Sequence, residues 1–113
     1  MIDYWHNPRC SKSRAGLALL HERGAQVALR LYLKQPPTLA ELRAVTSALA
    51  LPAIAMMRTG EATFRDLGLS ADSDEETLLT AMAAHPILIE RPIGIRGSTA
   101  VIGRPPEALL DLL

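Results

Sequence analysis

Residues 2–33 contain a strand, a helix and a second strand joined by short connections. Ile2 to His6 has the pattern of a short apolar strand, and residues 11–23 form an apolar helical pattern that Gly24 ends. Val27 to Leu33 is rich in leucine, β-branched and aromatic residues, which predicts the second strand. Because a helix crosses over between them, we expect the two strands to be parallel with a right-handed connection.

Between this unit and the next strand, the sequence predicts helices and turns but no strand. Pro36-Pro37 ends the second strand. The two longer helices begin with the capping-box patterns Thr38-x-x-Glu41 and Ser73-x-x-Glu76. The expected helical ranges are 38–49, 52–57 and 73–85, and residues 63–67 are expected to form a short turn that Gly68 closes.

The last part of the chain returns to a strand pattern. Ile87 to Ile89 predicts a third strand, and residues 93–95 and 99–102 predict an antiparallel hairpin around the turn Arg96-Gly97-Ser98. Whether residues 87–95 form one strand or a bent pair is left open. Pro105-Pro106 then predicts a terminal helix.

The element order is therefore β-α-β, then helices, then β-β-α. This is the thioredoxin pattern. It predicts an α/β fold with a mixed four-stranded sheet, helices on both sides and a helical insertion between the βαβ and ββα halves. A length of 113 residues fits one domain over residues 1–113.

Composition restricts the environment and the partners of the chain. Apolar residues make up 49% of it, which is enough for a core without disulfides. Twelve basic residues balance twelve acidic ones, which argues against direct nucleic-acid or anionic-membrane binding driven by net charge. The sequence shows no secretory signal or membrane-spanning run, so we expect a cytoplasmic protein.

The only cysteine, Cys10, falls where the first strand gives way to the first helix. Free backbone N–H groups at a helix start favour a thiolate, and Arg9, Lys12 and Arg14 add positive charge nearby. The alternative is a buried structural cysteine. The polar, turn-like residues around Cys10 argue against burial, which favours the reactive cysteine.

A single cysteine also limits the chemistry. Ser13 stands where a Cys-x-x-Cys redox protein has its second thiol, so a second sulfur must come from another molecule. We expect no metal site, because His6, His21 and His85 show no ligand spacing with Cys10 beyond His6-x-x-x-Cys10.

Two long motifs indicate a family. His6-Asn7-Pro8-x-Cys10-x-x-Ser13-Arg14 resembles the signature of the glutaredoxin-linked arsenate reductases, and His85-Pro86-Ile87-Leu88-Ile89-x-Arg91-Pro92-Ile93 resembles their second motif. Shorter matches cover the rest of the chain in order: Leu31-Tyr32-Leu33 with Pro36-Pro37, Arg58 with Asp66-Leu67-Gly68-Leu69, and Gly103-Arg104-Pro105 with Leu109-Leu110-Asp111.

The resemblance implies roles for individual residues. Cys10 is the implied nucleophile, and Arg58, Arg91 and Arg104 match the arginines that handle the oxyanion, a task that suits planar guanidinium groups. Pro92 matches a cis-proline opposite the cysteine. The resemblance also implies glutathione as co-substrate, glutaredoxin as partner and no tightly bound cofactor.

The surrounding residues allow more than one interpretation. His6 either tunes the thiolate or makes a structural hydrogen bond, and Ser13 either caps the helix or donates to the sulfur. We expect Asn7 to shape the turn, while Arg14 follows the family pattern. Arg9, Ser11 and Lys12 depart from it and can alter which anion or thiol is accepted.

Taken without the resemblance, the three arginines have plainer explanations. Arg58 and Arg104 fit surface or loop charges, whereas Arg91 lies between apolar segments and needs a partner or a ligand. His85 before Pro86 fits a structural role.

Three functions follow as hypotheses. The first is reduction of arsenate to arsenite through a covalent Cys10 adduct that glutathione and glutaredoxin resolve. The second is a redox-responsive transcriptional regulator that binds RNA polymerase, since the family contains such relatives. The third is a glutathione-dependent thiol oxidoreductase with another substrate.

Overall fold

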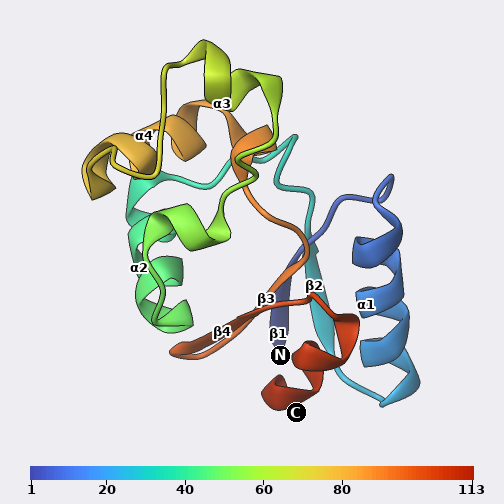
Figure 1. Ribbon diagram of the computed structural model, residues 1–113. Helices are drawn as coiled ribbons and strands as arrows, with labels where there is room; N and C mark the ends of the chain where they lie inside the picture. The colour runs from blue at the N-terminus through green and yellow to red at the C-terminus, as the bar shows by residue number, and fades with distance from the viewer. The chain divides into compact units, whose positions relative to one another are not determined.

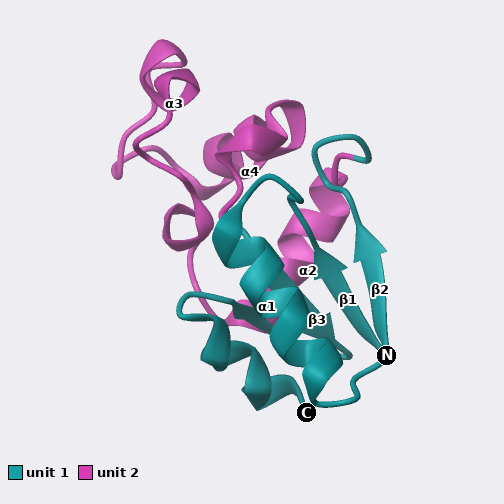
Figure 2. Cartoon of the chain, turned by 90° about the vertical axis from the view of Figure 1, so that its right-hand side faces the viewer, with its two compact units in different colours: residues 1–35, 91–113 teal, residues 36–90 magenta.

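The computed structural model describes residues 1–113, which divide into two compact units. One unit comprises residues 1–35 and 91–113, and the other comprises residues 36–90 (Figure 2). The second unit corresponds to the predicted helical insertion. The expectation that residues 1–113 form one domain stays a prediction.

The first unit contains a four-stranded mixed sheet with the strand order β2-β1-β3-β4. β1 pairs with β2 in parallel, whereas β3 pairs antiparallel with both β1 and β4 (Figure 1). The predicted sheet is thus confirmed. The elements of this unit are β1 (Ile2–Trp5), α1 (Ser11–Glu22), β2 (Val27–Arg30), β3 (Ile93–Arg96), β4 (Thr99–Ile102) and the 3₁₀-helix η3 (Pro106–Leu112).

α1 and η3 pack on this sheet around one apolar cluster. The cluster joins Ile2 and Tyr4 of β1 to Leu20 of α1 and to Leu109 and Leu112 of η3. Figure 2 shows α1 in front of the strands of this unit. Burial of these side chains is the main force that holds α1, and hence the residue that precedes it, against the end of β1.

α1 approaches the sheet closely because it has a glycine at the contact. A Cβ atom on Gly16 would overlap the hydroxyl of Tyr4 and would come within 2.6 Å of Leu109 Cδ1. Only glycine leaves room for this approach.

β2 is shorter than predicted. The chain leaves the sheet after Arg30, and the amides of Lys34 and Gln35 both donate to the carbonyl of Leu31. The Arg30 side chain adds a bond from Nε to the carbonyl of Gln35 at 3.0 Å. These local turn bonds replace the ladder bonds that a longer strand would need.

The second unit consists of five helical segments: α2 (Leu39–Leu49), η1 (Ala53–Met56), α3 (Ala62–Asp66), α4 (Glu75–Ala84) and η2 (Pro86–Leu88). The first predicted capping box is confirmed. Glu41 N donates to Thr38 Oγ1 at 3.1 Å, and Thr38 N donates to Glu41 Oε1 at 3.0 Å.

The second predicted capping box is wrong. α4 begins at Glu75, and its N-cap is Asp74, which accepts from the amide of Thr77 at 2.7 Å. A carboxylate meets the positive end of the helix dipole with a full charge, which a serine hydroxyl does not carry. Ser73 Oγ accepts instead from the amide of Ser70 at 3.0 Å.

The predicted strand at Ile87 to Ile89 is also wrong, because Pro86–Leu88 forms the 3₁₀-helix η2. Proline has no N–H for a ladder, and its fixed φ suits the first turn of a helix. Ile89 makes only an isolated antiparallel bridge with Met57. The third strand of the sheet is therefore β3.

None of the helices combines the length and apolar character needed to cross a bilayer.

Candidate active site at the end of the sheet

Three strand ends meet at one edge of the first unit. Trp5, the last residue of β1, pairs with Ile93 at the start of β3, and Ile93 pairs with Ile102 at the end of β4. The segments just beyond these ends carry Cys10, Arg91 and Arg104 respectively. The sheet register therefore brings to one edge three residues that lie far apart in the sequence.

Cys10 is the N-cap residue of α1, with φ −92° and ψ 123°. Its amide donates to the carbonyl of Asn7 at 3.0 Å, and its own carbonyl accepts from the amide of Arg14 at 3.0 Å. The expectation from the polar surroundings was wrong in one respect, because Cys10 is buried and only 9% exposed. The side chain nevertheless lies at the start of a helix, where backbone N–H groups are unsatisfied.

The surroundings of Cys10 shift its thiol toward the thiolate form. Burial works against this by raising the pKa of Cys10, but a hydrogen bond from the Arg91 side chain, the backbone amides of Ser13 and Lys12, and the charge of Arg91 lower it more. The two amides act without standard capping geometry, since the Cys10 side chain makes no cap hydrogen bond. The pKa of Cys10 is lowered overall.

A second arginine reaches the same sulfur. Arg104 Nη2 lies 3.6 Å from Cys10 Sγ, and Arg104 Nε donates to the carbonyl of Arg91 at 2.8 Å. Two guanidinium groups therefore act on one thiol. The peptide bond between Arg91 and Pro92 is cis, as predicted.

Ser13 holds the loop that precedes the cysteine. Its Oγ lies 2.7 Å from His6 Nδ1 and accepts from the amide of Asn7 at 3.0 Å, while its carbonyl accepts from the Tyr4 hydroxyl at 2.7 Å. Ser13 is completely buried. Neither expected role of Ser13 is seen, because its hydroxyl is engaged by the loop and neither caps α1 nor donates to the sulfur.

The other loop residues also act structurally. Asn7 shapes the turn, since its Oδ1 accepts from the amide of Arg9 at 3.0 Å. Arg14 Nη1 donates to the carbonyl of Pro8 at 2.9 Å. Burial, and then the charge of Arg14, lower the pKa of His6, so its imidazole is neutral near pH 7 and makes the structural contact with Ser13.

The ArsC family model matches residues 5–112, which include the whole of this site. The chain belongs to the ArsC family.

ArsC relatives match over nearly the full chain. A protein of Neisseria meningitidis serogroup A named arsenate reductase is 46% identical over 99% of this chain and 97% of its own length. A Haemophilus influenzae protein of the same name is 42% identical over 99% of this chain and 98% of its own length. The solved structure of an arsenate reductase from Vibrio cholerae has a TM-score of 0.95 at 41% identity, covering 99% of this chain and 97% of that chain. These matches agree with the predicted thioredoxin-like fold.

The third predicted arginine of the ArsC motif lies in the other unit. Arg58 is paired twice, from Nε to Glu61 Oε1 at 3.0 Å and from Nη1 to Glu90 Oε1 at 2.9 Å. Burial acts to lower the pKa of Arg58, but the two carboxylates raise it overall. Its role toward an oxyanion stays a prediction.

Glu61 and Glu90 were missed by the sequence analysis. Glu61 carries a usable signal, because it lies three residues after Arg58 at the spacing of a local ion pair. Glu90 directly precedes Arg91 but pairs with a residue 32 positions away, so no local pattern indicates it.

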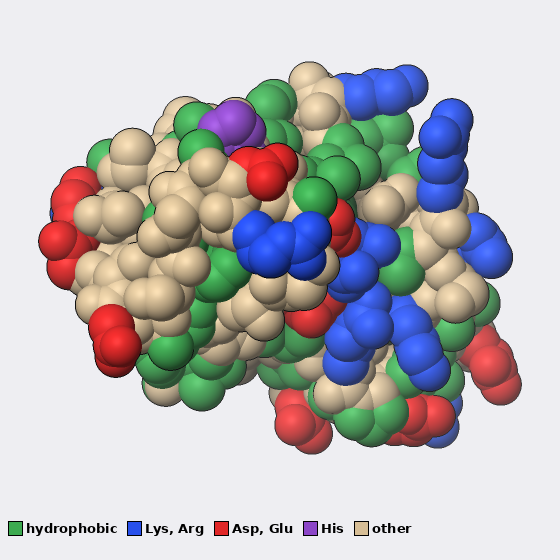
Figure 3. All heavy atoms as spheres, turned by 45° about the horizontal axis from the view of Figure 1, so that its top comes forward, with side chains coloured by type: hydrophobic (Ala, Val, Ile, Leu, Met, Phe, Trp, Pro, Cys, Tyr) green, Lys and Arg blue, Asp and Glu red, His purple; other side chains and the backbone are tan.

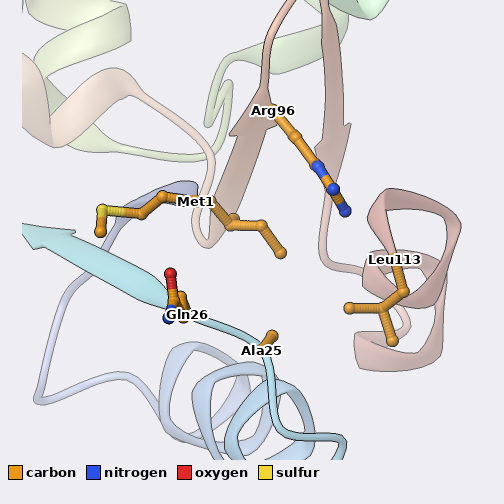
Figure 4. Close-up of a pocket in the computed structure, with 6 residues that line it drawn as sticks. Met1, Ala25, Gln26, Arg96 and Leu113 are labelled. Carbon is orange, nitrogen blue, oxygen red and sulfur yellow. The ribbon is translucent and has the colours of Figure 1, made fainter.

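Another hollow in the first unit offers less chemistry. A hollow of about 180 Å³ beside Met1, Gln26 and Leu113 has Arg96 as its only charged side chain (Figure 4). The Nη1 of Arg96 donates to the Leu112 carbonyl at 2.8 Å.

No three His, Cys, Asp or Glu side chains gather into a metal site. Figure 3 shows side chains of both charges on one face of the molecule, in keeping with the balanced composition.

Proposed function

We propose that this chain is an arsenate reductase and that Cys10 is its nucleophile. The observation that carries the proposal is the contact of Arg104 Nη2 with Cys10 Sγ at 3.6 Å, beside a thiol whose pKa Arg91 lowers. Relatives at 42–46% identity carry the name arsenate reductase, which supports the same substrate.

The two arginines suit a tetrahedral oxyanion. Arsenate carries delocalised negative charge, and guanidinium groups bind such anions through paired, charge-assisted hydrogen bonds. Arg91 and Arg104 come from segments next to β3 and β4, so the sheet holds them before the substrate arrives. Preorganised donors of this kind also stabilise the charge that develops during attack.

The first chemical step is attack of the Cys10 thiolate on arsenic(V). A sulfur–arsenic bond forms and an arsenic–oxygen bond breaks, and the departing oxygen leaves as water after taking up protons. The arsenic is not yet reduced. The product is a covalent adduct on Cys10.

The second step needs a thiol from another molecule, because Cys10 is the only cysteine in the chain. We assign this role to glutathione. Its sulfur bonds to the Cys10 sulfur, the electron pair of the sulfur–arsenic bond stays with arsenic, and arsenite, arsenic(III), departs. The resulting mixed disulfide is then cleaved by a glutaredoxin thiol, which restores the Cys10 thiolate.

This scheme uses no tightly bound cofactor. It also needs a supply of reduced thiols, so we place the reaction in the cytoplasm, where thiols are kept reduced.

The test is arsenate-dependent NADPH consumption coupled through glutathione, glutaredoxin and glutathione reductase. We expect activity in the wild type and in Arg23→Gln, whose changed residue is exposed after the end of α1. We expect none in Cys10→Ser. Activity retained in Cys10→Ser would overturn the assignment of Cys10 as the nucleophile. A folded wild type without arsenate-dependent turnover would overturn the assignment of arsenate as the substrate.

A further inference from the structure

A cavity of about 270 Å³ opens next to the cysteine loop. One wall is formed by residues 6–9 of that loop, and the other by Leu31, Leu33 and Lys34. Trp5 and Arg30 pair at the ends of β1 and β2, so both walls leave the sheet at the same edge. That edge also carries Cys10.

The walls combine apolar surface with two positive charges. Leu33 is 42% exposed, which is high for a large apolar side chain that lines a cavity. Arg9 and Lys34 are both exposed, and neither forms an ion pair with a carboxylate. Arg43 and Arg58, in contrast, each have a glutamate partner. The cavity therefore offers uncompensated positive charge beside an apolar wall.

The cavity wall and the nucleophile belong to one turn. Arg9 directly precedes Cys10, and the amide of Cys10 donates to the carbonyl of Asn7 in the cavity wall at 3.0 Å. A molecule held in the cavity is thus next to the segment that carries the thiolate. The volume is slightly below the ~300 Å³ at which pockets for drug-sized ligands begin. It fits part of a small peptide.

We infer that this cavity binds the resolving thiol, a small peptide that carries carboxylates, with Arg9 and Lys34 as partners for those carboxylates. The inference rests on the proposed function, since it assigns a place to the co-substrate of that reaction. It also gives a role to Arg9, which departs from the family pattern. Leu31 and Leu33 provide the apolar wall for the peptide backbone and methylene groups.

The first experiment measures binding without chemistry. S-methylglutathione keeps both carboxylates but has no free thiol, so it reports on the cavity alone. Titrated into the ¹⁵N-labelled protein, it should shift the amide signals of residues 7–9 and 31–34. Arg9→Gln and Lys34→Gln should each weaken its affinity about tenfold, as expected for loss of a charge-assisted bond. Arg23→Gln, which removes an exposed charge just after the end of α1, should not.

The second experiment separates this site from the oxyanion site. In steady-state turnover, Arg9→Gln and Lys34→Gln should raise KM for glutathione, and Lys34→Gln should leave KM for arsenate unchanged. Turnover with β-mercaptoethanol, an uncharged thiol, should be the same in Lys34→Gln and the wild type.

The outcomes are distinct. Equal affinity for S-methylglutathione in wild type and both variants, or shifts confined to other residues, would overturn the inference and leave the proposed function intact. Absence of arsenate turnover with normal S-methylglutathione binding would overturn the proposed function and leave the cavity as a peptide-thiol site.

Discussion

Arg104 donates from Nε to the main-chain oxygen of Arg91 at 2.8 Å, and its Nη2 reaches the sulfur of Cys10 at 3.6 Å. One guanidinium thus joins the backbone before Pro92 to the sulfur of Cys10. Its position depends on two separate donors on a planar group, which a lysine cannot supply.

Arg104→Lys tests this geometry while keeping the charge. We expect kcat/KM for arsenate to fall about tenfold or more, because losing one well-placed charge-assisted bond in the transition state costs more than 1.4 kcal/mol. The measurement is steady-state turnover, with Arg23→Lys as the matched control. Full activity in Arg104→Lys would show that charge alone is sufficient.

The lowered pKa of Cys10 predicts the pH dependence of its reactivity. In the wild type, the thiolate should persist at lower pH than in the unfolded chain, so iodoacetamide should label the folded protein with a midpoint below that of an ordinary cysteine. Arg91→Gln removes a hydrogen bond and a positive charge that favour the thiolate, so the midpoint should move up. An unchanged midpoint in Arg91→Gln would contradict the assignment of Arg91.

Ser13→Ala tests whether the Ser13 hydroxyl holds the loop that precedes Cys10 in place. The change leaves the amide of Asn7 and the Nδ1 of His6 without their Ser13 partner inside the fold. We expect a loss of about 1–3 kcal/mol in the free energy of unfolding. Urea denaturation measures it, and Ser11→Ala, at an exposed position of the same helix, should change little. Similar losses of stability in both variants would argue against this role of the Ser13 hydroxyl.

Gly16→Ala tests the close approach of α1 to the sheet. The added methyl overlaps Tyr4 and Leu109, so we expect overpacking to cost about 1–3 kcal/mol of unfolding free energy. Gly60→Ala is the control, because a Cβ there meets nothing within 4 Å. Thermal unfolding of both variants compares them, and an equally stable Gly16→Ala would refute the tight contact.

The paired state of Arg58 predicts a rank order among the arginines. Because Glu61 and Glu90 offset its charge, Arg58→Gln should lower kcat/KM for arsenate less than Arg91→Gln does. Glu61→Gln and Glu90→Gln should each change stability by less than about 1 kcal/mol, since the pairs are partly exposed. A larger catalytic loss in Arg58→Gln than in Arg91→Gln would reverse this order.

Errors in the predicted elements have local physical causes. Residues 87–89 are apolar and two of the three are β-branched, which suits a strand or a buried turn equally, and Pro86 decides for the turn. Ser73 and Asp74 are both good N-caps, and their order along the chain cannot show which one meets the first free amide of α4.

The sequence by itself determined the β-α-β start, the place of Cys10 at the helix terminus and the hairpin of residues 93–102. These features depend on hydrophobic period, glycine and proline positions, and short connections, all of which act over a few residues. The family signature around Cys10 is equally local. The hydrogen bonds that Asn7, Ser13 and Arg14 make within the loop span no more than nine positions.

Only the tertiary structure decided which charges reach the sulfur. Arg104 lies 94 positions from Cys10, and the two meet because β3 pairs with β1 and with β4 in one particular register. The same applies to Glu90, which reaches Arg58 across 32 positions, and to Lys34, which lines a cavity with Arg9. Charged side chains carry no periodic signal for such long-range partners, so strand pairing and packing select them.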